Sequence, residues 1–354
     1  MTPIYIASIG SYAGKSLTAL VFGLRLRDRG LKVTYFKPVG TLPVREQGAV
    51  TDEDALFIAR ALGFEGPVGA LCPVLLTGDL AERALRGNAE KLDERVVEAY
   101  RTVSRGADVT VVGGVGTVSR GALVNLSARR VAELLDARVV VVARYESDTT
   151  VEEVLLARDV LGERLAAVVF NYVPEEALEH VRGPVREFLE RLGIAVIGAV
   201  PHDDVLGSVT VRELAEQLNA KVLCCENRLD DLVKHFVIGA MNVTSAVKYF
   251  RELEEKAVIT GGDRPDIQLA ALQTPTKAVI LTGNLHPSSV LVKRAQQVGV
   301  PMLLVSADTL STVEQIDRII GRLRVRESAK VDRARELLEK NLDFDRLSAI
   351  IGVS

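Results

Sequence analysis

The chain begins with residues suited to binding a phosphate group. In the segment SIGSYAGKS, residues 8–16, a glycine-containing loop follows an apolar run and precedes an amphipathic one. Such a loop directs backbone N–H groups towards an anion, and the N-terminus of the following helix favours negative charge. Lys15 could reach the β- and γ-phosphates of a nucleotide, and the Ser16 hydroxyl could bind Mg²⁺. The phosphate-binding residues predicted in this loop are Gly10, Ser11, Ala13, Gly14, Lys15 and Ser16.

The loop departs from the usual spacing by one residue. In G-x-x-x-x-G-K-[ST] the first glycine would stand at position 9, whereas this chain has Ile9 followed by Gly10. The alternative is a tight strand-to-helix turn in which Lys15 and Ser16 occur by chance. The order of apolar strand, Gly-Lys-Ser and amphipathic helix favours a phosphate-binding loop, while the displaced glycine leaves its shape open.

Further charged residues follow the second expected strand. Lys37, in VTYFKPVG, lies at the carboxyl end of that strand, where ligands bind in open α/β sheets. The run TDEDAL then places Asp52, Glu53 and Asp54 at the start of a helix. Asp54 could cap this helix or bind a metal ion. Because Lys15, Ser16 and Lys37 predict a nucleotide site, metal binding is favoured, with Ser16 and Asp54 as the predicted Mg²⁺ ligands.

Composition excludes several classes of protein. The 354-residue chain is 48% hydrophobic and 26% charged, with a net charge of −3, which is typical of a globular protein with a substantial core. Without a basic face we expect no nucleic-acid partner, and apolar runs shorter than roughly 20 residues predict no membrane association. The N-terminus lacks the pattern of a signal peptide. The three cysteines lack metal-ligand spacing and favour a reducing, cytoplasmic location.

Two other kinds of site are disfavoured. A serine or cysteine hydrolase needs a histidine placed beside its nucleophile, and none of the four histidines belongs to such a motif. A dinucleotide-binding fold would carry G-x-G-x-x-G and an acidic residue after the second strand, where this chain has Lys37.

The apolar patterns predict two α/β modules. Short β-branched runs alternate with amphipathic helical stretches, which indicates βαβ units and a doubly wound, mostly parallel sheet over residues 1–223. After a boundary at about 224–230, a smaller α/β module follows over 230–324, and residues 325–354 form a charged helical tail. The strands expected in the first module are residues 3–8, 32–37, 108–113, 137–143, 165–171 and 195–201.

The second module contains a Gly-Gly-Asp-Arg turn between an expected strand and an expected helix. Backbone N–H groups at such a turn could accept an anion. Alternatively, Asp263 caps the helix and pairs with Arg264 or with a partner chain. The sequence leaves both interpretations open. The residues predicted for a ligand site or an interface are Gly261, Gly262, Asp263, Arg264, Thr282 and Gly283.

The order of GKS, FKPVG, DEDAL, ADVTVVGGVG and VVFNYV resembles dethiobiotin synthetase and the related amidotransferase-type synthases. The resemblance implies that ATP or ADP binds with Mg²⁺, that Lys37 helps to bind phosphate and substrate, and that Asp54 binds the metal. It also implies that Asn171 recognises adenine. The family has a metal-binding glutamate where this chain has Gly113, which weakens the case for chemistry more than the case for binding.

The second module, from AVITGGDRPDIQLAAL to the run beginning KAVILTGNLHPSSV, resembles a DRTGG domain. The two modules in this order are similar to the non-catalytic N-terminal half of long phosphate acetyltransferases, across essentially the whole chain. Because the chain ends where the acetyltransferase domain would begin, we do not expect acetyl transfer by this chain alone. The resemblance implies roles in oligomerisation and metabolite control.

The sequence therefore predicts a regulatory or oligomerising protein that binds an adenine nucleotide and hydrolyses ATP slowly or not at all. We expect a homodimer formed through the DRTGG module, and a separate catalytic acetyltransferase chain is a candidate partner. The alternative is an ATP- and Mg²⁺-dependent synthase that activates a carboxylate as an acyl phosphate. In that case Lys15 and Lys37 would stabilise the transferring phosphoryl group.

Overall fold

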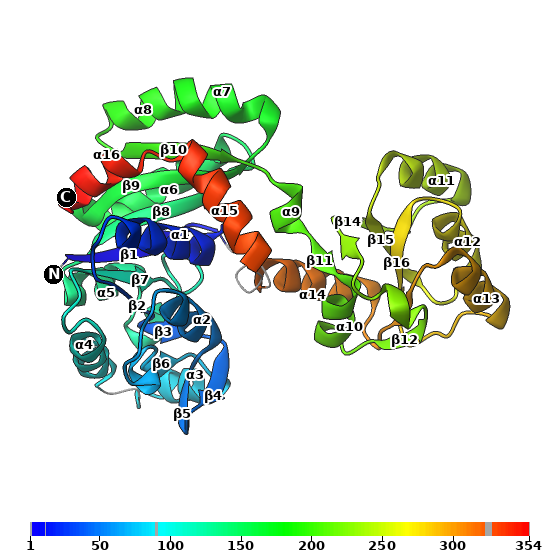
Figure 1. The fold of residues 1–354 in the computed structure, drawn as a ribbon, viewed down its shortest axis with the longest axis horizontal. Helices are drawn as coiled ribbons and strands as arrows, with labels where there is room; N and C mark the ends of the chain where they lie inside the picture. Colours follow the sequence, from blue (N-terminus) through cyan, green and yellow to red (C-terminus); the bar gives the residue numbers. More distant parts are fainter. Residues whose placement is uncertain (1, 11, 89–90, 323–327, 354) are drawn as a thin grey trace. The chain divides into compact units, whose positions relative to one another are not determined.

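A computed structural model describes residues 2–10, 12–88, 91–322 and 328–353. Its internal contacts divide the chain into two compact units, drawn in Figure 1. Unit 1 comprises Met1–His202 together with Val325–Ser354, and unit 2 comprises Asp203–Arg324. Within the described residues, no helix is both long enough and apolar enough to cross a membrane.

Unit 1 is built on a sheet of parallel strands. Its strands are β1 (Thr2–Ser8), β2 (Val33–Phe36), β7 (Val109–Gly113), β8 (Arg138–Arg144), β9 (Leu165–Val173) and β10 (Ala195–Pro201). They form one six-stranded sheet in the order β10-β9-β8-β1-β7-β2, and every neighbouring pair is parallel. The middle of β8 is buried throughout, as expected for a strand covered on both faces. The predicted doubly wound sheet is confirmed.

Helices cover both faces of this sheet (Figure 1). Helix α1 packs beside the C-terminal helix α15 on one face, while α4, α5 and α6 form the layer on the other. Helices α7 and α8 flank a π-helical turn, Val181–Val185, beside β10. The helices are α1 (Lys15–Asp28), α2 (Glu53–Ala61), α3 (Gly78–Leu85), α4 (Leu92–Val103), α5 (Ala128–Leu135), α6 (Thr149–Leu161), α7 (Leu178–His180), α8 (Arg186–Arg191), α15 (Ser328–Asn341) and α16 (Phe344–Ile351).

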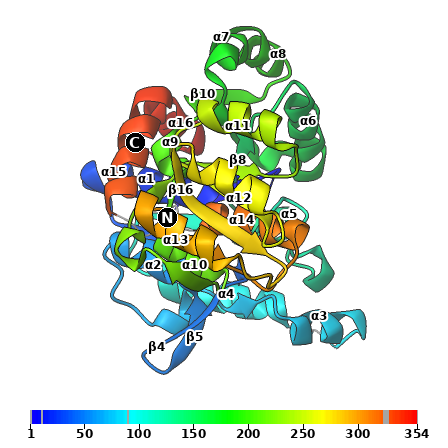
Figure 2. The same ribbon diagram turned by 90° about the vertical axis from the view of Figure 1, so that its right-hand side faces the viewer.

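A small excursion between β2 and α3 was not expected from the sequence. The strands β4 (Pro43–Glu46) and β5 (Ala49–Asp52) form an antiparallel hairpin that extends away from the main sheet (Figures 1 and 2). Strands β3 (Val39–Gly40) and β6 (Val74–Leu75) form a second, parallel pair. This segment leaves the sheet after β2, at Lys37. It returns at the end of β5, where Asp52 lies beside Lys37.

The C-terminal helices belong to unit 1 rather than forming a separate tail. The rings of Phe22 in α1 and Phe344 in α16 stack with their centroids 6.1 Å apart. Arg335 donates to Asp28 at 2.5 Å, and Arg346 donates to Glu190 at 2.6 Å. Residues 325–354 had been predicted to form a separate charged helical tail, but the apolar face of these helices completes the helical layer over α1 and β10.

Unit 2 contains a smaller sheet. Its strands are β12 (Lys221–Cys224), β14 (His235–Ile238), β15 (Lys256–Gly261), β16 (Thr276–Thr282) and β17 (Met302–Leu304), with a short pair β11 (Val209–Thr210) and β13 (Leu232–Val233). The order is β12-β17-β16-β15-β14, parallel except for β12. Its helices are α9 (Asp204–Gly207), α10 (Val211–Gln217), α11 (Val243–Glu252), α12 (Pro265–Leu272), α13 (Ser289–Val298) and α14 (Thr309–Arg322).

The domain boundary lies earlier than the predicted boundary at 224–230. Strand β12 is hydrogen-bonded to β17, so it belongs to the sheet of unit 2. Val211 and Leu214 of α10 are buried in one cluster with Ile280 and Leu303. The sequence of α10 and β12 would look the same in either domain. The boundary at His202 therefore becomes visible only once β12 is seen to pair with β17.

Candidate phosphate-binding site

The loop between β1 and α1 encloses the ammonium group of Lys15. Lys15 Nζ donates to the Ser8 hydroxyl at 2.9 Å, and Ser8 Oγ lies 2.7 Å from Gly10 O and 2.9 Å from Gly116 O. Burial, together with the nearby charge of Lys37, lowers the pKa of Lys15 to about 8, while the Asp54 carboxylate acts in the opposite direction. The lysine is therefore held at the end of β1, at the N-terminus of α1. Ser8 was not predicted as a site residue.

The two glycines of the loop have different structural roles. Gly14 has φ +92°, and a Cβ atom there would overlap the side-chain amide of Asn171, so this position requires glycine. A Cβ atom on Gly10 would meet nothing within 4 Å. The glycine that is displaced in the sequence is therefore not needed for the shape of the loop. The predicted site residue Ser11 lies outside the described residues.

Asn171 comes from the end of β9 and contacts the loop directly. Its Nδ2 donates to Ala13 O at 2.9 Å, and its Oδ1 accepts from Tyr172 N at 3.0 Å. The Arg144 guanidinium lies 5.0 Å from the centroid of the Tyr172 ring. The structure thus brings Asn171, Ala13 and Gly14 together, although the role of Asn171 in recognising adenine stays a prediction.

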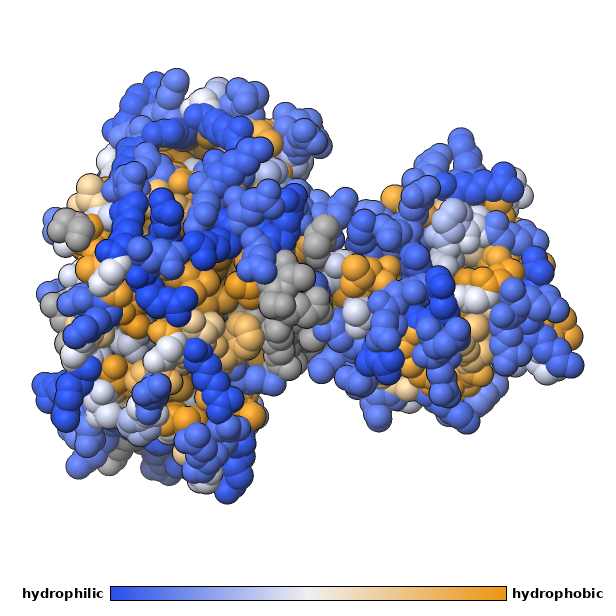
Figure 3. Space-filling model, in the orientation of Figure 1, coloured by the Kyte–Doolittle hydropathy of each residue, from blue (hydrophilic) through white to orange (hydrophobic). Residues whose placement is uncertain are grey.

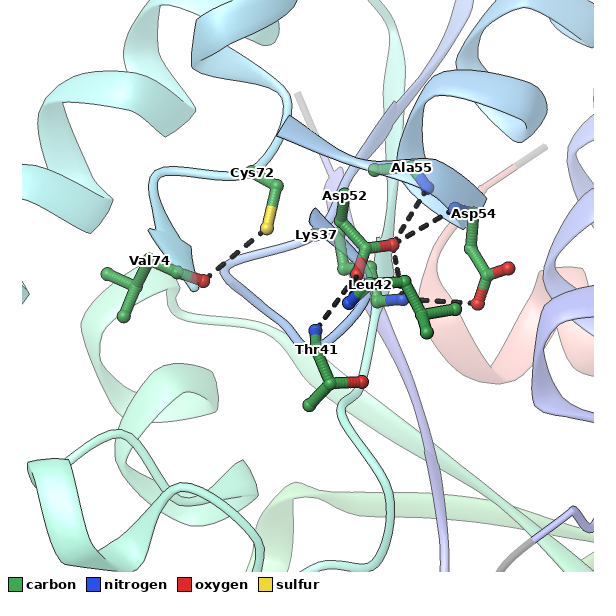
Figure 4. A network of polar contacts seen from close by, with 8 residues as sticks. All are labelled: Lys37, Thr41, Leu42, Asp52, Asp54, Ala55, Cys72 and Val74. Carbon is green, nitrogen blue, oxygen red and sulfur yellow. Dashed lines mark hydrogen bonds and ion pairs between the residues drawn. The ribbon is translucent and has the colours of Figure 1, made fainter. Parts of the chain in front are cut away.

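Lys37 forms a buried ion cluster with two carboxylates (Figure 4). Its Nζ lies 2.7 Å from Asp52 Oδ1 and 3.2 Å from Asp54 Oδ2. Lys37 is 5% exposed and Asp52 is fully buried. Burial opposes the charge of Lys37, but the carboxylates of Asp54 and Asp52 raise its pKa above the ordinary value. Lys37 therefore remains a cation at neutral pH.

Asp52 provides the helix cap that the sequence had left open for Asp54. Its Oδ1 accepts from Asp54 N at 3.0 Å and from Ala55 N at 3.2 Å, at the N-terminus of α2. Its Oδ2 accepts from Thr41 N at 2.9 Å and Leu42 N at 3.0 Å, which fixes the preceding turn (Figure 4). Asp52 is thus structural, and the Asp54 carboxylate, with its side chain 18% exposed, faces Lys37 instead of capping the helix.

The oxygen atoms that the protein offers are too few to hold Mg²⁺ alone. They fit a Mg²⁺ ion that is also bound by phosphate. No cluster of three or more His, Cys, Asp or Glu side chains suited to a metal occurs in the described part of the chain. Mg²⁺ at nucleotide sites is bound by one or two protein oxygens together with phosphates and water. The half-buried Ser16 at the start of α1 and the Asp54 carboxylate match that requirement.

Tyr35 occupies the space that a side chain at position 113 would need. A Cβ atom on Gly113 would overlap the Tyr35 hydroxyl, and Tyr35 is 2% exposed. Strands β2 and β7 are neighbours, with Tyr35 opposite Val111, so residue 113 lies diagonally across from the ring. Burial raises the pKa of the Tyr35 phenol, which therefore stays neutral and cannot replace a metal-binding carboxylate.

The Gly-Gly-Asp-Arg turn of unit 2 is held by uncharged contacts. Gln268 Nε2 donates to Gly261 O at 3.1 Å and to Gly262 O at 3.0 Å. The α12 helix begins after Arg264, so Asp263 does not cap it, and Arg264 pairs with Asp266 at 3.1 Å instead. Of the two interpretations left open by the sequence, the structure contradicts the one in which Asp263 caps the helix.

The remaining unit 2 candidates lie beside this turn. Gly261 pairs in register with Thr282, and the Thr282 hydroxyl lies 2.8 Å from Thr309 Oγ1. Gly283 follows with φ +76°. The predicted residues therefore gather at the carboxyl ends of β15 and β16, and a ligand for them stays a prediction.

Comparison with known proteins identifies both modules. The model of an AAA domain matches residues 2–210, and that of the DRTGG domain matches residues 213–319. The chain belongs to this AAA domain family. It thus combines a P-loop domain of the nucleotide-binding type with a DRTGG domain.

The curated relatives are phosphate acetyltransferases. The Pseudomonas aeruginosa enzyme is 27% identical over 99% of this chain and 52% of its own length, and the Synechocystis enzyme is 23% identical over 97% and 51%. The chain spans about half the length of these relatives, and the predicted resemblance to their N-terminal half is confirmed. The septum site-determining protein MinD of Pyrococcus horikoshii, solved with Mg-ADP, is 16% identical over 58% of this chain and 83% of that one. The TM-score between the two structures is 0.35.

Proposed function

We propose that this chain binds an adenine nucleotide with Mg²⁺ and serves as a regulatory and oligomerising protein related to the non-catalytic half of phosphate acetyltransferases. The observation that carries the proposal is that Lys15 lies at the carboxyl end of β1, and the cluster of Lys37, Asp52 and Asp54 at the carboxyl end of β2, in one parallel sheet. The charges of Lys37 and Asp54 both act on Lys15, so the two lysines share one electrostatic site.

In this proposal each group has a separate task. Lys15 and the N-terminus of α1 attract the phosphates. Lys37 supplies a second cation that the buried carboxylates keep protonated. Ser16 and Asp54 would hold Mg²⁺, whose chemistry is to neutralise charge on the phosphate oxygens. Asn171, placed at the loop by its bond to Ala13, would turn its amide to the adenine when nucleotide binds.

We propose further that ATP is hydrolysed very slowly. Position 113 lacks the carboxylate of the dethiobiotin synthetase type, and Tyr35 fills the space with a neutral group. Loss of one preorganised charged group costs about 3 kcal/mol of transition-state stabilisation, roughly a hundredfold in rate. Steady turnover on the order of 1 per second would overturn this part and favour the alternative, a carboxylate-activating synthase.

Unit 2 is proposed to dimerise and to respond to a metabolite. Hydrophobic residues reach its surface among hydrophilic ones (Figure 3). The exposed group includes Val243 in α11, Leu269 in α12 and Val290 in α13, three helices that pack in series. A separate acetyltransferase chain is a candidate partner of the assembly. A cytoplasmic location is proposed from the three cysteines, which are all free thiols.

The nucleotide proposal is tested by thermal unfolding with ATP or ADP and Mg²⁺. Ligand that binds only the native state stabilises it by about 2.7 kcal/mol at a hundredfold excess over Kd. We expect Lys15→Ala to abolish most of that shift. The matched control is Arg158→Ala, which removes an exposed cation of unit 1 and should leave the shift intact. An unchanged shift in Lys15→Ala would refute the site.

The dimer proposal is tested separately by light scattering on the full chain. We expect a homodimer at micromolar concentration, and we expect Leu269→Asp with Val290→Asp to give a folded monomer that still binds nucleotide. If the unsubstituted chain is a monomer, the dimer proposal is wrong, while the proposal of a nucleotide site is unaffected.

A further inference from the structure

Unit 1 has an open cavity of about 670 Å³ at the end of its strands opposite to the phosphate-binding loop. It is lined by the start of β2, by the ends of α1 and α4, and by the segment that follows α2. Lys15 and Lys37 lie at the carboxyl ends of β1 and β2, whereas this cavity lies at the amino end of β2. Its volume is in the range of small-molecule sites in proteins.

The cavity is lined by more positive than negative charge. Arg27, Lys32 and Arg105 line it, and Glu65 is the one carboxylate among the lining residues. Within the described residues, none of the three cations forms an ion pair with a carboxylate. Arg27 Nη1 donates to Ala61 O at 2.9 Å, which holds the guanidinium at the end of α2 and leaves its other N–H donors for a ligand.

The wall also contains a buried hydroxyl without a hydrogen-bond partner. Thr34 is 5% exposed, and its Oγ1 has no partner in the described structure. An unpartnered buried hydroxyl is unfavourable and requires an explanation, such as a ligand or an ordered water. Thr34 lines the cavity, so a molecule bound there could supply the missing contact.

An aromatic ring forms the apolar side of the cavity. Phe64 lies against the backbone of Gly66, where a Cβ atom would come within 2.5 Å of the ring. Glycine at position 66 therefore allows the ring to lie flat beside the segment after α2. Leu31, Leu62 and Val103 complete this apolar wall.

We propose that this cavity binds a small organic anion, with its acidic group on Arg27, Lys32 and Arg105 and its apolar body against Phe64. An anionic group would supply the counter-charge that these cations lack, and an oxygen of the same group would accept from Thr34. The site is separate from the proposed nucleotide site and does not depend on it.

The test uses the fluorescent dye 1-anilinonaphthalene-8-sulfonate, an aromatic anion, with the full chain. The chain has no tryptophan, which keeps the protein background low. We expect saturable binding that Lys32→Ala with Arg105→Ala weakens about tenfold, because charge-assisted hydrogen bonds are lost. The uncharged analogue N-phenyl-1-naphthylamine should be insensitive to this double variant.

The matched control is Arg158→Ala with Arg191→Ala, which removes the same charge from exposed positions of unit 1 outside the cavity. It should leave dye affinity unchanged, as should Lys15→Ala. Dye binding that responds equally to both double variants, or to neither, would overturn the proposal. Benzoate and phenyl phosphate serve as competitors, and displacement by one of them identifies the acidic group. Failure of both to displace the dye would also overturn the site.

Thr34→Val provides an independent measurement because it keeps the shape of the side chain and removes the hydroxyl. Dye affinity should fall about fivefold, the effect of one lost hydrogen bond. The melting temperature without dye should not fall, since the removed group has no partner in the free protein. Unchanged dye affinity in this variant would refute the contact between Thr34 and the ligand.

Discussion

The loop before α1 and the turn before α12 occupy corresponding places in two mostly parallel sheets, yet they are built differently. Each leads from the carboxyl end of a strand into a helix through a glycine whose Cβ atom would clash. At the carboxyl ends of β1 and β2, unit 1 carries Lys15 and a buried cluster of Lys37 with two aspartates. The turn of unit 2 is held by the amide of Gln268, with its one ion pair exposed at the surface.

This difference shows that the same strand-to-helix topology can carry very different arrangements of charge. Both turns present a helix N-terminus to the same edge of a sheet, but only unit 1 keeps charged groups buried there. A buried charge is costly unless it is paired and hydrogen-bonded, and Asp52 meets this condition with four backbone N–H groups and Lys37. Because burying these charges is unfavourable, we infer that the cluster serves the function of unit 1.

The largest expected effect follows from breaking that cluster. Asp52→Ala would remove the cap of α2 and leave Lys37 buried without its closest counter-ion. Breaking a buried ion pair by removing one partner costs about 3–5 kcal/mol. We expect a loss of this size in the free energy of unfolding, measured by denaturant titration with circular dichroism.

The corresponding change in unit 2 is Asp266→Ala, which breaks the exposed pair with Arg264. Exposed pairs contribute little because water already solvates both charges. We expect almost no change in unfolding. Equal losses in the free energy of unfolding for Asp52→Ala and Asp266→Ala would show that the two ion pairs contribute equally to stability.

The glycines offer a second comparison. Gly14→Ala and Gly262→Ala both introduce a clash, and overpacking of this kind costs about 1–3 kcal/mol. We expect both variants to be destabilised, but only Gly14→Ala to lose the thermal shift produced by ATP and Mg²⁺. Gly10→Ala is the control and should be neutral in both measurements, since nothing lies near its Cβ. Loss of nucleotide binding in Gly262→Ala would implicate the turn of unit 2.

The strands, the loop and Lys37 were predictable because their signals are local. β-branched runs, the Gly-Lys-Ser order and the position of Lys37 after a strand need no knowledge of distant residues. Asn171 reaches Ala13 across 158 positions of sequence, and only the family resemblance had placed it at this site.

Other features depend on contacts that the sequence does not display. Asp52 and Asp54 are two residues apart and chemically alike, and the extended backbone of Asp52 decides which one caps α2. Tyr35 fills the space beside Gly113 because β2 and β7 are neighbours in the sheet, a pairing of distant segments. The same limit explains why the C-terminal helices had been assigned to a separate tail.

The space beside Gly113 gives a third prediction. Restoring the family's carboxylate with Gly113→Glu would force the new side chain into Tyr35, so we expect a loss of about 1–3 kcal/mol in stability. In the Tyr35→Ala background, which itself loses about 3–5 kcal/mol because the ring is buried, Gly113→Glu should cost less, since the ring no longer occupies the space. Thermal unfolding of the two variants tests this, and a stable Gly113→Glu protein would show that Tyr35 moves aside readily.

The smallest expected effect is a dependence of stability on pH. It distinguishes Lys15, at the loop of unit 1, from Lys256, a buried lysine of unit 2. The pKa values of Lys15 and Lys256 are both lowered from 10.5 to about 8, chiefly by burial. Between about pH 8 and 10.5 the unfolded chain therefore holds protons that the folded chain has released, so each lysine makes stability rise with pH in this window. Among the described residues, Lys256 donates only to the carbonyls of Leu253 and Pro275, so a nucleotide should not alter its pKa.

Lys15 should respond to the nucleotide, because phosphate charge favours its protonated form. Binding above pH 8 must then take up a proton, and the affinity for ATP should fall by up to about tenfold per pH unit above that value, while staying level below it. Isothermal titration in buffers of different ionisation enthalpy measures the proton uptake directly. Lys15→Arg keeps the charge at all these pH values and should remove the dependence, whereas Lys256→Met should retain it. If proton uptake persists in Lys15→Arg, another group takes up the proton. That result would contradict a contact between Lys15 and the phosphates.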